Sequence, residues 1–127
     1  MNLEKITFAF FILLASTLNF GFFVGDPIDP AQHNAYELFA ALAVSLIATI
    51  IKVGDRTHVG AVLLAASLVA DLGLLAACLV WGITVYAMNL PLSPANMSSI
   101  VSLSGGALLA NLVSVALLMI EVAAARR

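Results

Sequence analysis

Four long apolar stretches separated by short polar segments dominate the chain. They cover approximately residues 6–24, 36–53, 59–86 and 98–124. An α-helix needs about 20 apolar residues to cross the hydrocarbon core of a bilayer, and each stretch is close to that length or longer. The pattern predicts an all-α fold, a four-helix transmembrane bundle in which residues 1–127 form a single domain.

The polar segments carry signals for helix ends. Gly25 is suited to the end of the first helix, and Asp29, which precedes a proline, is suited to the N-cap of the second. Asp55 and Ser93 are the expected N-caps of the third and fourth helices. The first stretch is too long for the apolar core of a signal peptide, so we expect a membrane span.

Composition agrees with this pattern. Hydrophobic residues make up 63% of the chain, charged residues make up 9%, and the mean hydropathy is +1.13. A soluble domain is about a quarter charged, so too little polar surface exists for a soluble particle. The net charge of −2 at pH 7 gives no basic surface for nucleic acid, which we exclude as a partner.

The basic residues predict the orientation in the membrane. In a four-span arrangement Lys5, Lys52, Arg56, Arg126 and Arg127 all fall on one side. Lys and Arg in short loops stay on the cytoplasmic side, so both termini and the one basic loop are expected there. Trp81 and Tyr86, near the far end of the third stretch, are expected to anchor it at the interface.

No catalytic or cofactor-binding motif is present. The sequence has no Gly-rich phosphate loop, no His-Glu-x-x-His, no CxxC pair and no nucleophile elbow. His33 and His58 are expected on opposite sides of the membrane, which argues against a paired-His metal site. We therefore expect no enzyme, no catalytic residue, no metal and no cofactor.

Asp71 is the most informative residue, because it lies near the middle of the third stretch. An acidic side chain at the bilayer centre costs about 2.5 to 3.5 kcal/mol on insertion scales. One interpretation is a neutral carboxyl group that joins helices through a hydrogen bond with Asn111 or Ser67. The alternatives are a proton or cation site and a partner for a basic group on another protein.

Small and polar residues recur around these positions. The fourth stretch places Ser104, Ala107, Asn111 and Ser114 at near-helical spacing, which predicts a helix-contact face. Asn19 in the first stretch is expected to bond to another helix. Asp71, Asn111, Ser67, Ser114 and Asn19 together form the predicted intramembrane polar site.

Charged groups mark the two ends of the predicted bundle. Lys52, Arg56 and His58 form a basic loop, expected to set topology and to bind anionic headgroups, with docking of a cytoplasmic partner as the alternative. On the outer side, Asp26, Asp29 and Glu37 form a small acidic cap together with His33, although Glu37 also suits the positive end of a helix dipole. Glu121 is expected either to pair with Arg126 or Arg127 or to extend its carboxylate toward the interface.

The segments LNFGFFVGD and YELFAALAVSLIATIIKVGDRTHVGAVLLAASLVADLGLLAACLVWGI resemble a family of small bacterial inner-membrane proteins of unknown function. The resemblance covers residues 18–83 approximately. It implies the four-span fold and the bacterial inner membrane, and it implies no mechanism and no site residues.

Three functional hypotheses follow. The leading one is a small non-enzymatic subunit or modulator of an ion-transport complex, with cations as the candidate ions. A second is a homo-oligomeric ion or proton conduit, lined by Asp71, Ser67, Asn111 and Ser114. A third is a structural organiser of the membrane without transport activity. The expected partners are the lipid bilayer and either copies of the chain or a larger membrane protein.

Overall fold

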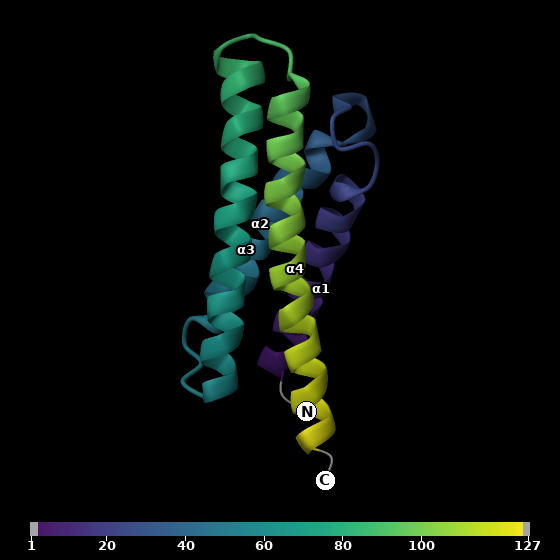
Figure 1. The fold of residues 1–127 in the computed structure, drawn as a ribbon. Helices are drawn as coiled ribbons and strands as arrows, with labels where there is room; N and C mark the ends of the chain where they lie inside the picture. Colours follow the sequence, from purple (N-terminus) through teal and green to yellow (C-terminus); the bar gives the residue numbers. More distant parts are fainter. Residues whose placement is uncertain (1–2, 126–127) are drawn as a thin grey trace.

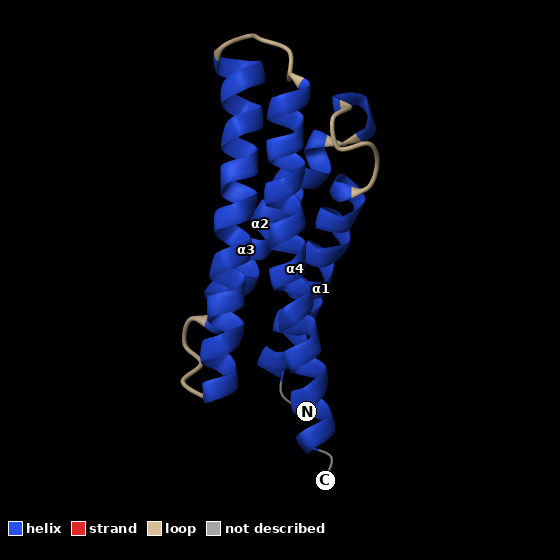
Figure 2. Cartoon of the chain, in the orientation of Figure 1, coloured by secondary structure: helices blue, strands red, loops and turns tan. Residues whose placement is uncertain are grey.

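The computed structural model describes residues 3–125 as an antiparallel bundle of four long helices (Figures 1 and 2). In chain order the elements are α1 (Leu3–Phe23), the short 3₁₀-helix η1 (Pro30–Gln32), α2 (Ala35–Lys52), α3 (His58–Gly82), the π-helical turn η2 (Ile83–Ala87) and α4 (Pro94–Ala125).

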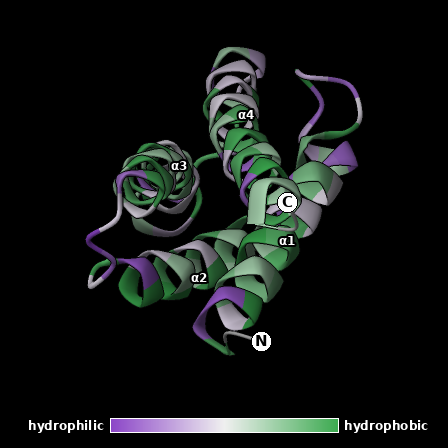
Figure 3. Cartoon of the chain, turned by 90° about the horizontal axis from the view of Figure 1, so that it is seen from below, coloured by the Kyte–Doolittle hydropathy of each residue, from purple (hydrophilic) through white to green (hydrophobic). Residues whose placement is uncertain are grey.

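The helices form a closed ring. Each packs against its neighbours in the sequence, and α4 closes the ring by packing against α1 (Figure 3). The α3–α4 pair has the most extensive contact. Gly73 explains part of this, because a Cβ at that position would lie 3.0 Å from the carbonyl oxygen of Leu103 and 3.3 Å from the Cβ of Ala107. The missing side chain therefore lets the two backbones approach closely.

The predicted fold class is confirmed. The described residues contain four helices long and apolar enough to cross a membrane, with η2 continuing α3: Leu3–Phe23, Ala35–Lys52, His58–Ala87 and Pro94–Ala125. They begin one to four residues before the predicted stretches, because the polar residues that cap a helix precede its apolar run.

Two of the predicted N-caps are wrong. Asp29 caps η1 by accepting from the amide of Ala31, whereas Asn34 caps α2 through the amide of Tyr36. Thr57 caps α3, and Asp55 instead accepts from Thr57 inside the turn. In both connections the chain makes an extra turn before its helix begins, so the first capping-type residue is not the one next to the helix.

Two other predicted helix ends agree with the structure. Gly25 follows the end of α1 with a φ of +114°, a conformation that residues with a side chain rarely adopt. Before α4, the Ser93 hydroxyl accepts from the amide of Asn96 at 3.1 Å.

The far end of α3 also differs from its prediction. Trp81 is 8% exposed and packs edge-on against Phe22, with 6.1 Å between ring centroids, so it is a core residue and not an interface anchor. Tyr86 is 69% exposed, as an anchor would be. The chain then leaves the helix through η2, where the amide of Met88 bonds to the carbonyl oxygen of Ile83.

The apolar core has two parts. The outer cluster lies toward the α3–α4 loop and includes Phe22, Leu38, Leu74, Trp81 and Ile100. The inner cluster lies toward the termini and consists of Phe8, Ile12, Ala48, Leu63 and Leu118.

Candidate functional site

Asp71 is buried between α2 and α3 and is held by two hydroxyl groups of α2. The Ser45 hydroxyl donates to Oδ1 over 2.6 Å, and Thr49 Oγ1 lies 2.5 Å from Oδ2. Ser45 and Thr49 are one helical turn apart, so they face the same side of α2. The antiparallel α2–α3 hairpin brings this side against the middle of α3, where Asp71 is 7% exposed.

The hydrogen-bond geometry at Thr49 suits both protonation states of Asp71. Thr49 Oγ1 lies within bonding distance of Asp71 Oδ2 and also of the Ser45 carbonyl oxygen, at 3.0 Å. A hydroxyl group has one hydrogen to donate. An ionised Asp71 accepts this hydrogen, whereas a protonated Asp71 donates to Thr49, which then donates to the Ser45 carbonyl.

A cleft of about 250 Å³ leads from the bundle surface to Asp71. Its walls come from α2 and α3: Leu42, Leu46, Thr49, Leu68, Asp71, Leu72 and Leu75. Several of these leucines are half exposed, so the cleft opens on the face that a lipid or another helix would cover. Asp71 and Thr49 are the polar side chains in its wall.

A layer of buried polar side chains separates the two apolar clusters. We call it the central polar layer, and its members are Asn19 of α1, Ser45 of α2, Ser67 of α3, and Asn111 and Ser114 of α4. On each helix these residues lie between a member of the outer cluster and a member of the inner cluster. All five are fully buried, so they face the interior of the bundle.

The predicted pairing of Asp71 with Asn111 or Ser67 is wrong. Within residues 3–125, the side chains of Asn19, Ser67, Asn111 and Ser114 have no hydrogen-bond partner, although each is fully buried. The Asp71 carboxyl group faces α2, where it contacts Ser45 and Thr49, and not Asn111 of α4. Each unmade bond of a buried polar group costs about 1–3 kcal/mol.

Sequence reasoning missed Ser45 and Thr49 as partners of Asp71. Serine and threonine in a helix can bond back to the preceding turn, and Thr49 has such a contact, to the Ser45 carbonyl, in addition to its contact with Asp71. Their spacing of four residues was a usable signal, because it places two hydroxyl groups on one face of the helix that precedes Asp71.

Lys52 is not part of an exposed basic loop. It is the last residue of α2 and 1% exposed, and its Nζ lies 3.3 Å from both Glu4 Oε1 and Asp55 Oδ2. It also lies 4.4 Å from the ring centroid of Phe8. Lys52 thus joins α1 to the α2–α3 turn, and only Arg56 and His58 of the predicted basic loop are exposed.

Asp55 is held as a carboxylate in the same turn. The amide of Thr57, then its hydroxyl, and then Lys52 lower the pKa of Asp55 to about 2. Glu121 pairs with Lys5 at 3.2 Å and so connects α4 to α1. Its predicted partners, Arg126 and Arg127, lie outside the described residues.

Two residues of the predicted outer acidic cap, Asp26 and Asp29, stabilise the α1–α2 connection, and Glu37 belongs to helix α2. Asp26 accepts from the amide of Ile28, and Asp29 caps η1. Glu37 lies in the first turn of α2, with its carboxylate against Gly21 of α1. His33 is buried, with its two ring nitrogens 2.6 and 2.7 Å from the carbonyl oxygens of Phe22 and Asp26.

No metal centre is visible in residues 3–125, because no three His, Cys, Asp or Glu side chains gather there in a way that would hold an ion. Asp26 and Asp29, in the α1–α2 connection, accept backbone hydrogen bonds, and Glu4, Asp55 and Glu121, at the opposite end of the bundle, pair with lysines.

The fold and the buried polar groups define a small all-α protein whose four helices are suited to crossing a membrane. Residues 32–122 match a family described as "Family of unknown function (DUF6394)", and the chain belongs to this family. The match begins after α1 and ends within α4, so it overlaps the predicted resemblance of residues 18–83 only from residue 32 onward and extends further along the chain to residue 122. No curated protein and no solved structure matches the chain.

Proposed function

We propose that this protein is a non-enzymatic membrane subunit that assists ion transport, with Asp71 as its proton-exchanging group. The observation that carries the proposal is the pair of hydroxyl contacts at Asp71, which suits the protonated and the ionised carboxyl group alike. A carboxyl group that serves only as a structural link needs one protonation state, whereas one that takes up and releases a proton needs both.

The surroundings of Asp71 favour a subunit over a complete transporter. The cleft at Asp71 opens between α2 and α3 on the apolar outer face. A helix of a partner that covers this face would be within reach of the carboxyl group. Intramembrane acidic residues commonly mark proton or ion paths, and they pair with groups on neighbouring helices.

The homo-oligomeric conduit has less support. A pore between copies would need its lining residues on the surface of one copy, but Ser67, Asn111 and Ser114 are fully buried inside a single bundle. Of the four proposed lining residues, only Asp71 reaches a surface cleft.

The proposed location is the bacterial inner membrane, with both termini in the cytoplasm. The start of α1, the α2–α3 connection and the end of α4 lie toward one end of the bundle, and the α1–α2 connection lies toward the other (Figure 1). The first end carries Lys5, Lys52 and Arg56, and the α1–α2 connection carries Asp26 and Asp29. Retention of basic residues in the cytoplasm supports this orientation.

Native mass spectrometry of the gently extracted complex tests the subunit role, with every co-purifying chain identified. A reproducible larger membrane partner supports the proposal. A homo-oligomer with no other chain contradicts it.

Flux measurements test the role of Asp71. Proton and cation flux through the purified complex in liposomes is compared for the wild type, Asp71→Asn and Asp29→Asn. We expect Asp71→Asn to reduce flux about tenfold or more, as loss of a proton-transfer group does. Asp29→Asn makes the same chemical change outside the predicted spans and should behave as wild type. Unchanged flux in Asp71→Asn would contradict the role of Asp71 in transport and would favour the hypothesis of a structural organiser of the membrane.

A further inference from the structure

Four members of the central polar layer have hydrogen-bonding atoms without a protein partner. Within residues 3–125, no hydrogen-bond partner is present for the side-chain nitrogen and oxygen of Asn19 and Asn111. The same holds for the hydroxyl oxygens of Ser67 and Ser114. All four side chains are fully buried. In most proteins such groups are hydrogen-bonded, either to protein or to an ordered water molecule.

Helix register places these groups in one region of the bundle. Gly73 of α3 lies against Ala107 of α4, and the two helices are antiparallel. Ser67, six residues toward the inner end from Gly73, is therefore level with the segment between Asn111 and Ser114. Asn19 enters the same interior from α1.

The chemistry of the unpartnered atoms selects the ligand. The two amides need hydrogen-bond acceptors for their NH₂ groups and donors for their oxygens, and the serine hydroxyls can do both. A metal cation offers no acceptor to an NH₂ group. Water offers two donors and two acceptors, and it typically makes about three bonds in buried sites.

We propose that the central polar layer is an internal water-binding site of the bundle. Ser67 lies one helical turn from Asp71 on α3, and the buried Ser45 hydroxyl donates to Asp71 Oδ1. The site therefore lies about one helical turn from the carboxyl group. The inference does not depend on a transport role, and it would stand if Asp71→Asn left every ion flux unchanged.

Radiolytic labelling in H₂¹⁸O tests the site directly, with the full chain in lipid nanodiscs. Hydroxyl radicals formed from bound water oxidise the side chains next to it, even where bulk solvent has no access. Leu63, one turn from Ser67, is 1% exposed, and Leu38 in the outer cluster is the matched control at 0%. We expect ¹⁸O incorporation several-fold higher at Leu63 than at Leu38. Equal labelling of the two leucines at background level overturns the proposal.

Substitution of a layer hydroxyl gives a second readout. Ser67→Ala removes a group that water would bind, so it should lower both the ¹⁸O incorporation at Leu63 and the Tm. Ser104→Ala is the control, because the Ser104 hydroxyl is equally buried but is bonded to the carbonyl oxygen of Val101 at 2.9 Å. A higher Tm in Ser67→Ala would mean that the hydroxyl is dry and unsatisfied, and would also overturn the proposal.

Discussion

Individual side chains join the helices of this bundle by two kinds of contact. In the middle of the bundle Asp71 is hydrogen-bonded to two hydroxyl groups of α2. At the end of the bundle that contains the α2–α3 turn, Lys52 pairs with two carboxylates. Both ionisable groups are more than nine-tenths buried. A buried charge is tolerated only when it is paired, hydrogen-bonded or neutralised, so each of these residues depends on its partners.

Thr49→Val should destabilise the bundle by about 0.5–2 kcal/mol, because it removes a hydroxyl contact to Asp71 while keeping the shape of the side chain. The free energy of unfolding in mixed micelles measures the effect. Thr17→Val is the matched control, since that exposed hydroxyl bonds only to Leu13 of its own helix. Equal losses in the two variants would mean that the contact to Asp71 contributes nothing.

Lys52→Met should cost about 1–3 kcal/mol, because it keeps the apolar stem against Phe8 but removes the buried ammonium group that bonds to Glu4 and Asp55. Lys5→Met makes the same change in the more exposed pair with Glu121, where we expect less than about 1 kcal/mol. The same unfolding assay compares the two. A larger loss in Lys5→Met would contradict the assigned importance of the buried lysine.

At the scale of elements, close packing is concentrated in the α3–α4 hairpin. Gly73 has almost no free space on its α4 side, whereas an added Cβ at Gly106 would meet nothing within 4 Å. These glycines of α3 and α4 thus differ in role, and the helix-contact face predicted around Asn111 is the buried one. A glycine is needed for helix packing where the backbone of another helix lies against it, as at Gly73, and not where the space beside it is open, as at Gly106.

Gly73→Ala should destabilise the protein by about 1–3 kcal/mol, because the new methyl group forces α3 and α4 apart. Gly106→Ala should be neutral or stabilising by up to about 1 kcal/mol, since alanine favours the helix and the space is open. Thermal unfolding of both variants checks the difference. If Gly73→Ala also stabilised, the close approach at Leu103 would be refuted.

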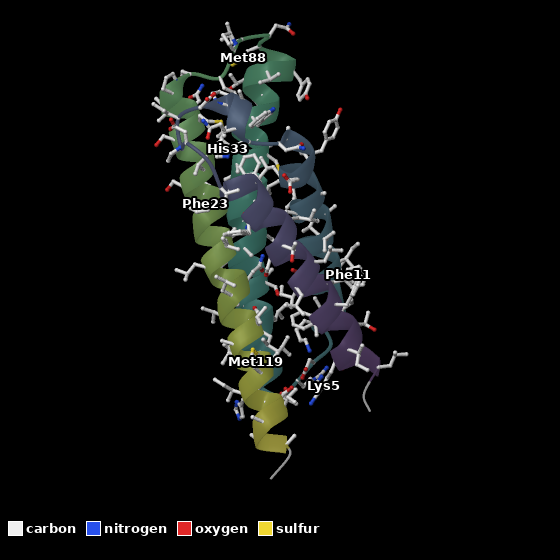
Figure 4. All side chains as sticks on the ribbon, turned by 90° about the vertical axis from the view of Figure 1, so that its right-hand side faces the viewer. Lys5, Phe11, Phe23, His33, Met88 and Met119 are labelled. Atoms are coloured by element: carbon white, nitrogen blue, oxygen red, sulfur yellow. The ribbon has the colours of Figure 1, made fainter. Side chains whose placement is uncertain are left out.

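At the scale of the whole molecule, charge is divided between the two ends of the bundle. Lys5 and Met119 lie toward one end, and His33 and Met88 lie toward the other (Figure 4). Hydrophilic residues are concentrated near loops and helix ends, with apolar residues along the helices (Figure 3). This distribution agrees with the proposed orientation, in which the end that carries the basic residues lies in the cytoplasm.

Labelling of single cysteines in intact cells tests this orientation. Cys78 is replaced by Ala, and a cysteine is introduced by Gly54→Cys in the α2–α3 turn or by Met88→Cys at the opposite end. A thiol reagent that cannot cross the membrane should label Met88→Cys in intact cells, and Gly54→Cys only after lysis. The reverse pattern would invert the proposed topology.

The four apolar stretches and the short segments between them were enough to predict four helices, their order and their antiparallel packing. Hydrophobic length and turn residues are local properties, and the bilayer restricts the available folds. The same pattern singled out Asp71, Asn111, Ser67, Ser114 and Asn19, because polar residues in apolar stretches are conspicuous without a structure.

The partners of those residues were decided only by tertiary packing. Rotation of α3 about its axis turns Asp71 toward Ser45 and Thr49 and away from Asn111, and the tight approach at Gly73 sets that rotation together with the α4 register. The burial of Lys52 likewise depends on Glu4, which is 48 residues distant in the sequence. Depth along a helix can be counted in residues, but the direction in which a side chain points depends on how all four helices pack together.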